Sequence, residues 1–114
     1  MRQQQRLERA VASQHGRCLW CGRPFGELIA ATTDHLVPRA KGGPSIAENE
    51  VAACRRCNAR RGHQGPAQWA EQARELYGTA PEVRKLLLRL ADRLDDVGGS
   101  RRARTYLDAQ LRRC

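Results

Sequence analysis

Two pairs of cysteines carry the strongest chemical signal in the sequence. Cys18 and Cys21 are separated by two residues, and so are Cys54 and Cys57. Two such pairs supply four thiolates, the number that a zinc ion takes in a closed, tetrahedral structural site. We therefore predict that the residues between the pairs loop out from one structural zinc ion, whose binding stabilises the fold. Buried cysteines without a metal and an iron–sulfur cluster are the alternatives.

A closed site with four cysteine ligands has no open position for a substrate, so other residues must carry any reaction. Asp34 directly precedes His35 between the pairs, Asn49 lies before the second pair, and Asn58 follows it. Histidine is well suited to accept a proton near neutral pH, and an adjacent carboxylate can bind a cation that neutralises phosphate charge. Taken singly, these residues are common in turns, loops and helix caps. Their order around the cysteines favours one reactive site.

The charge of the chain indicates a polyanionic partner. Its 114 residues include 21 Lys and Arg against 12 Asp and Glu, which gives a formal net charge of +9. Because guanidinium groups pair bidentately with phosphate, this arginine-rich composition favours nucleic acid, with a merely solvated surface as the alternative. The candidate nucleic-acid contacts are Arg39, Lys41, Arg55 and Arg61.

The location of the protein is predicted from what the sequence lacks. No apolar run approaches membrane-spanning length, and the N-terminus has no apolar stretch typical of a secretory signal. We therefore expect a cytoplasmic protein without a membrane partner. Cysteines in a reducing compartment bind metals more often than they form disulfides. Cys114 is left without a role.

An α+β arrangement must position these residues. We predict a helix over residues 3–14, a strand over 28–38, a loop, a strand over 50–53 and a short helix ending at Gly62. Asp34 and His35 then lie late on the first strand. Because neighbouring strand side chains point to opposite faces, the strand must end or twist there if both are to serve one site.

Amphipathic helices are expected after Pro66. The predicted helices cover residues 66–77, 81–97 with an apolar stripe from Val83 to Val97, and a shorter segment capped by Ser100. Thr79 and Glu82 predict a capping box. We divide the chain into a core over 1–65 and a helical extension over 66–114. This extension could complete the core, contact DNA or form a homodimer through the stripe, so both monomer and homodimer are open.

The ordered motifs resemble those of the HNH endonuclease family, which has the ββα-metal or His-Me finger fold. The matching runs are CLWC, DHLVPRAKGG, AENEVAAC and CRRCNARR, and they cover about residues 15–63. The resemblance implies a small zinc-stapled ββα core, here with an N-terminal helix and a C-terminal helical extension.

The resemblance also implies a role for each matching residue. His35 would be the general base that deprotonates water, Asp34 and Asn58 would hold one Mg²⁺ or Mn²⁺ ion, and Asn49 would fix the loop and the imidazole. Arg61 matches the family's basic position and is expected to contact phosphate. Apart from the resemblance, His63 is a rival third ligand, and His15, which precedes the first cysteine pair, could be a ligand or a structural residue.

One position departs from the family pattern. Glu50 stands where the family usually has an apolar residue. Because an unpaired buried carboxylate is costly, we expect Glu50 to be exposed or paired with an arginine.

The implied function is a metal-dependent endonuclease that hydrolyses DNA phosphodiester bonds, one strand per active site. Double-stranded DNA is the expected partner, with low sequence specificity because we find no separate sequence-reading module. Small chains of this type resemble phage-encoded or mobile-element nucleases. A non-catalytic, zinc-stapled nucleic-acid-binding module and an RNA substrate are the alternatives.

Overall fold

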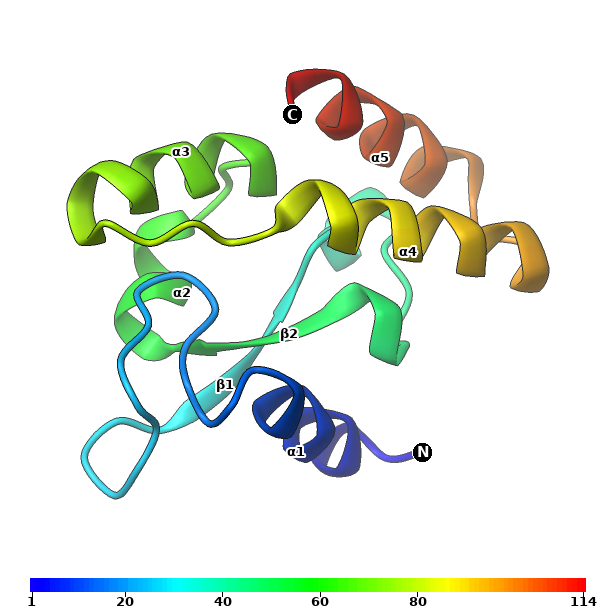
Figure 1. The fold of residues 1–114 in the computed structure, drawn as a ribbon. Coiled ribbons are helices and arrows are strands. Elements are labelled where there is room, and N and C mark those ends of the chain that lie inside the picture. Colours follow the sequence, from blue (N-terminus) through cyan, green and yellow to red (C-terminus); the bar gives the residue numbers. More distant parts are fainter.

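A short antiparallel β-ribbon lies at the centre of the computed structural model, which describes residues 1–114 (Figure 1). Strand β1 (Ala31–His35) pairs with β2 (Glu50–Cys54), and the register sets Ala31 opposite Cys54 and His35 opposite Glu50. The first strand begins three residues later than predicted, because the chain beyond Cys54 turns into a helix and offers no partner. Leu28, expected in this strand, is 99% exposed on the preceding loop.

One helix completes the ββα unit, and a second helix packs against the ribbon. Helix α2 (Arg55–Arg61) follows β2 directly, packs against both strands and ends at Gly62. Helix α1 (Gln3–Ser13) packs mainly against β2. Just after α1, the Gln14 side chain hydrogen-bonds to both the N–H and the C=O of Ala52, at 2.9 and 2.8 Å. The predicted α+β class and the N-terminal helix are confirmed.

The loop between the strands contains two short 3-10 helices, η1 (Arg39–Lys41) and η2 (Ala47–Asn49). Gly43 is required there by a close approach of the backbone, because a Cβ atom at this position would lie 1.8 Å from the carbonyl oxygen of Val37. The loop therefore folds tightly back on the residues that follow His35.

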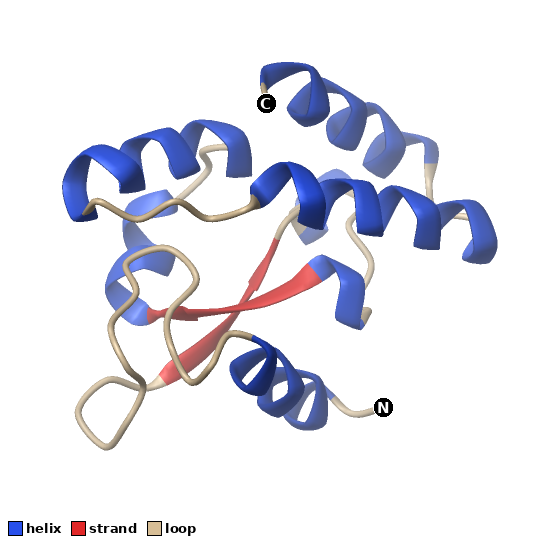
Figure 2. Ribbon diagram, viewed as in Figure 1, coloured by secondary structure: helices blue, strands red, loops and turns tan.

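Three C-terminal helices cover one side of the ββα unit (Figure 2). They are α3 (Pro66–Tyr77), α4 (Val83–Val97) and α5 (Arg101–Arg113). The apolar residues of α4 join Trp20, Val51 and Trp69 in one buried cluster. The predicted stripe on α4 is therefore not free to form a dimer surface, since of its members only Val97, 47% exposed, lies at the surface. None of the helices combines the length and apolar character needed to cross a bilayer.

The ends of α4 and α5 test two capping predictions. Ser100 Oγ accepts a hydrogen bond from the Ala103 N–H, so the predicted N-cap of α5 is confirmed. The capping box at Thr79 and Glu82 is wrong, because α4 begins after Glu82 without a side-chain cap. The Thr79 hydroxyl instead donates to the carbonyl oxygen of Trp20 at 2.6 Å, which ties the α3–α4 connection to the first cysteine pair.

Helix α5 also returns to the loop that follows His35. Ser100 Oγ donates to the carbonyl oxygen of Gly42 at 3.4 Å, and Arg102 Nη2 donates to that of Ala40 at 2.5 Å. Residues near the end of the chain thereby hold the segment next to the predicted reactive pair.

Candidate functional site

The four cysteines of the two pairs meet in one cluster. The Sγ atoms of Cys18, Cys21, Cys54 and Cys57 lie within 4.8 Å of one another, and those of Cys21 and Cys54 are 3.8 Å apart. Zinc–sulfur bonds of about 2.3 Å in a tetrahedron place the sulfur atoms about 3.8 Å apart. The cluster thus fits a metal ion such as zinc, and the predicted gathering of the four cysteines is confirmed.

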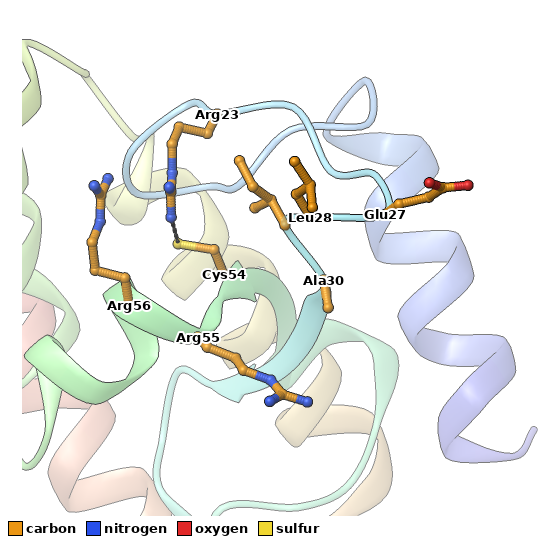
Figure 3. A pocket seen from close by; sticks show the side chains of 8 residues that line it. Arg23, Glu27, Leu28, Ala30, Cys54, Arg55 and Arg56 are labelled. Atoms are coloured by element: carbon orange, nitrogen blue, oxygen red, sulfur yellow. Dashed lines mark hydrogen bonds between the residues drawn. The ribbon is translucent and has the colours of Figure 1, made fainter.

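Arg23 favours the thiolate form at one edge of this cluster. Burial raises the pKa of Cys21, but hydrogen bonds from the Arg23 backbone and guanidinium outweigh it, and the net pKa is lowered to about 6. Arg23 Nη2 also donates to Cys54 Sγ at 3.2 Å, and the pKa of Cys54 is lowered despite burial (Figure 3). Burial raises the pKa of Cys18 and of Cys57. A bound cation would displace the protons that those two thiols keep.

Asp34 is held by two donors on the face of β1 that α2 covers. It is 6% exposed, its Oδ1 accepts from Arg61 Nη1 at 2.6 Å, and its Oδ2 accepts from Trp20 Nε1 at 2.9 Å. Each carboxylate oxygen can accept more than one bond, so these contacts orient the group and leave ligand positions.

His35 lies at the last position of β1 and makes a different contact. Its Nε2 is 3.1 Å from Glu50 Oε2, and its side chain is 16% exposed. Glu50 is buried and paired with Arg6, whose Nε lies 2.5 Å from Glu50 Oε1. Of the two outcomes expected for Glu50, exposure or pairing with an arginine, the structure shows the second. No hydrogen bond joins His35 to the Asp34 side chain, although β1 ends at His35 as the shared site requires.

Asn58 reaches β1 from α2, on the same side as Arg61. Its Nδ2 donates to Thr32 Oγ1 at 3.1 Å and to the carbonyl oxygen of Thr33 at 3.2 Å. Because the amide nitrogen donates both of these hydrogen bonds to β1, the amide oxygen is available for another partner. Carboxylate and amide oxygens are ligands that suit Mg²⁺ or Mn²⁺, so the donor types of Asp34 and Asn58 fit such an ion.

Asn49 is fully buried and joins the two ends of the tight loop. Its Oδ1 accepts from the Val37 N–H at 2.8 Å, and its Nδ2 donates to the carbonyl oxygens of Val37 and Pro44 at 3.0 and 2.9 Å. Its own carbonyl accepts from the N–H of Leu36 at 2.9 Å. Asn49 therefore fixes the backbone immediately after His35.

The predicted nucleic-acid contacts divide by exposure. Arg39, Lys41 and Arg55 are exposed. Arg55 borders a cleft of about 330 Å³ beside the cysteine cluster, and Figure 3 shows its side chain directed away from Cys54.

Arg61 requires a correction, because it is 3% exposed. Its guanidinium donates to Asp34, to the carbonyl oxygens of His35 and Leu36, and to that of Gln64. Arg61 is therefore buried and is not presented to phosphate, in contrast to the exposed Arg55. The motif identifies Arg61 as the family's basic position, but it does not show that the guanidinium is buried against the residues at the end of β1.

Comparisons with known proteins agree with this arrangement. A model of the HNH endonuclease family matches residues 18–73, which include both cysteine pairs, Asp34, His35 and Asn58. The chain belongs to the HNH endonuclease family.

Two relatives of this HNH chain are much longer proteins. The CRISPR-associated endonuclease Cas9 of Corynebacterium diphtheriae is 40% identical over 63 residues, which cover 54% of this chain and 6% of that protein. The crystal structure of the Type II-C Cas9 enzyme from Actinomyces naeslundii matches with a TM-score of 0.54 and 26% identity, over 94% of this chain and 11% of that chain. The three C-terminal helices are thus within the region of structural similarity.

Two residues around the HNH motif carry more than the sequence indicated. The indole N–H of Trp20 reaches Asp34, a contact that the sequence motifs do not predict. A buried tryptophan usually finds an acceptor, so its position between two metal ligands was the available signal. Glu50, for which only exposure or an arginine partner was expected, also contacts His35. The rival ligands His15 and His63 are exposed and make no hydrogen bond with any site residue.

Proposed function

We propose that this chain is a metal-dependent endonuclease that hydrolyses DNA phosphodiester bonds with low sequence specificity. One observation carries the proposal: Asn58 and Arg61 of α2 both contact β1 on the side where Asp34 is buried. This contact brings an amide and a carboxylate to facing elements, next to the histidine that ends the strand.

In the proposed reaction, His35 takes a proton from a water molecule whose oxygen attacks phosphorus. The bond from phosphorus to the 3′ oxygen breaks, which leaves a 5′-phosphate and a 3′-hydroxyl end. Asp34 and Asn58 would hold Mg²⁺ or Mn²⁺, and such an ion neutralises charge on the phosphate when bound. Trp20 and Arg61 orient Asp34, and Asn49 keeps the backbone after His35 in place.

The substrate is proposed from charge and from the relatives. The chain has a net charge of +9, and the exposed Arg39, Lys41 and Arg55 are available for phosphate contacts. One relative is named a CRISPR-associated endonuclease Cas9, and the other is named a Type II-C Cas9 enzyme. Because this chain spans only 6% of the curated relative, we propose the nuclease step alone and no larger assembly.

Supercoiled plasmid tests the proposal directly. Zinc-loaded protein is incubated with plasmid and Mg²⁺ or Mn²⁺, and wild type is compared with His35→Ala and with His63→Ala, an exposed histidine outside the site. We expect nicked or linear plasmid from wild type and His63→Ala, and at least about 100-fold less from His35→Ala. Equal cleavage by His35→Ala and His63→Ala, or no cleavage by wild type, would refute the endonuclease proposal. Incubation of the same protein with labelled RNA tests whether the enzyme cleaves RNA.

A second candidate is a non-catalytic, zinc-stapled DNA-binding module. The burial of Asp34 between Trp20 and Arg61 favours it, because a carboxylate with two protein donors can serve structure alone. Binding of DNA by wild type and His35→Ala without cleavage by either would support this candidate.

A further inference from the structure

Glu50 is a buried carboxylate directly opposite His35 in the β-ribbon. The two residues form a register pair, and His35 Nε2 lies 3.1 Å from Glu50 Oε2. The Glu50 side chain is 2% exposed, so water contributes little to its hydrogen bonding.

Arg6 holds Glu50 from the other side. Its Nε donates to Oε1 at 2.5 Å and its Nη2 to Oε2 at 3.3 Å, from helix α1. A carboxylate paired in this way with a guanidinium accepts hydrogen bonds and donates none. The hydrogen between Glu50 Oε2 and His35 Nε2 therefore belongs to the imidazole.

We propose that Glu50 is a positioning residue that fixes the tautomer of His35. The imidazole donates its Nε2–H to Glu50, which leaves the Nδ1 lone pair free, since the bond made by one ring nitrogen decides which nitrogen carries the proton. The next step rests on the proposed function: Nδ1 is then the atom that takes the proton from water. The resulting imidazolium has its positive charge beside the Glu50 side chain, whose Oε2 lies 3.1 Å from Nε2.

Replacement of Glu50 by glutamine should reverse the tautomer. Arg6 makes its shorter contact, from Nε at 2.5 Å, to Oε1 and its longer one, from Nη2 at 3.3 Å, to Oε2. The amide oxygen therefore stays at the Oε1 position, and the amide NH₂ faces His35 Nε2. Because this group is a donor, Nε2 must accept, and the proton moves to Nδ1. The matched control is Glu48→Gln, since Glu48 lies two residues away, contacts Arg93 and makes no contact with His35.

Long-range ¹H–¹⁵N correlation spectra of the zinc-loaded full chain, recorded at alkaline pH, distinguish the two tautomers. His35 is assigned by the signal missing from His35→Asn. We expect the Nε2–H pattern in wild type and Glu48→Gln, and the Nδ1–H pattern in Glu50→Gln. An Nδ1–H or exchange-averaged pattern in wild type, or an unchanged pattern in Glu50→Gln, would overturn the inference and leave Glu50 as a partner of Arg6 only.

Plasmid cleavage adds a functional readout. Glu50→Gln should lower kcat by about 100-fold with KM unchanged, because general-base catalysis contributes about 10²–10⁴-fold and the wrong nitrogen now carries the proton. An equal decrease of kcat in Glu48→Gln would contradict the positioning role. A change of KM without a decrease of kcat in Glu50→Gln would also contradict it. The spectra test the tautomer even if wild type leaves plasmid intact, so a failure of this inference is distinct from a failure of the proposed function.

Discussion

The hydrogen bond from Trp20 to Asp34 should be measurable as stability, because the chain contains its own control. Trp20 and Trp69 are both fully buried, but Trp20 Nε1 donates to a carboxylate at 2.9 Å whereas Trp69 Nε1 has no partner. Replacement of either tryptophan by phenylalanine removes a similar volume. Only Trp20→Phe also removes a hydrogen bond to a charged acceptor.

The expected difference follows from these contacts. A hydrogen bond to a charged group contributes about 1.5–3 kcal/mol, and removal of an unpaired buried donor costs nothing in hydrogen bonding. Trp20→Phe should therefore lower the free energy of unfolding by about 2 kcal/mol more than Trp69→Phe does. With a urea m-value of about 2 kcal/mol/M, the unfolding midpoint of Trp20→Phe should lie about 1 M below that of Trp69→Phe.

Urea unfolding followed by far-UV circular dichroism is the suitable assay, because it does not depend on tryptophan fluorescence. Zinc content is measured for each variant, since loss of zinc would lower stability for another reason. Equal midpoints for the two zinc-loaded variants would refute the reasoning and reduce Trp20 to a packing residue.

Two further predictions concern the metal cluster and the buried ion pair. Cys54→Ser should lose the one zinc per chain that we expect in wild type and unfold, whereas Cys114→Ser should keep both zinc and fold. Metal analysis and circular dichroism decide, and a folded, zinc-free Cys54→Ser protein would count against a stabilising metal. Arg61→Met should lower the free energy of unfolding by about 3–5 kcal/mol, because it leaves Asp34 buried without its cation. The exposed Arg55→Met should change stability by less than about 0.5 kcal/mol, and equal thermal shifts of the two variants would contradict the burial of Arg61.

The spacing of residues in the sequence was sufficient to predict features that depend mainly on short sequence motifs. Two cysteine pairs predict a shared metal wherever the chain between them can loop out, and Ser100 predicts a helix start from its own side chain. The helices and the two strands follow from apolar periodicity and turn residues.

Contacts between distant segments could not be predicted in this way. Arg61 has the same helical spacing whether it faces solvent or β1, and only the packing of α2 on the ribbon decides. Thr79 matches a capping pattern, but α4 begins only at Val83, and in the folded chain the Thr79 hydroxyl donates to the carbonyl of Trp20. The link from Trp20 to Asp34 likewise depends on how the first cysteine pair sits over β1.

The return of α5 to the loop after His35 bears on protein engineering. Ser100 and Arg102 hold the carbonyls of Gly42 and Ala40, and a Cβ at Gly42 would lie 2.5 Å from Ser100 Oγ. A minimal fragment that stops at the end of the motif would leave this loop without its clamp and would expose the apolar side chains that α4 and α5 cover. For grafting into a fusion enzyme, the smallest transplantable unit is therefore the motif together with its three C-terminal helices.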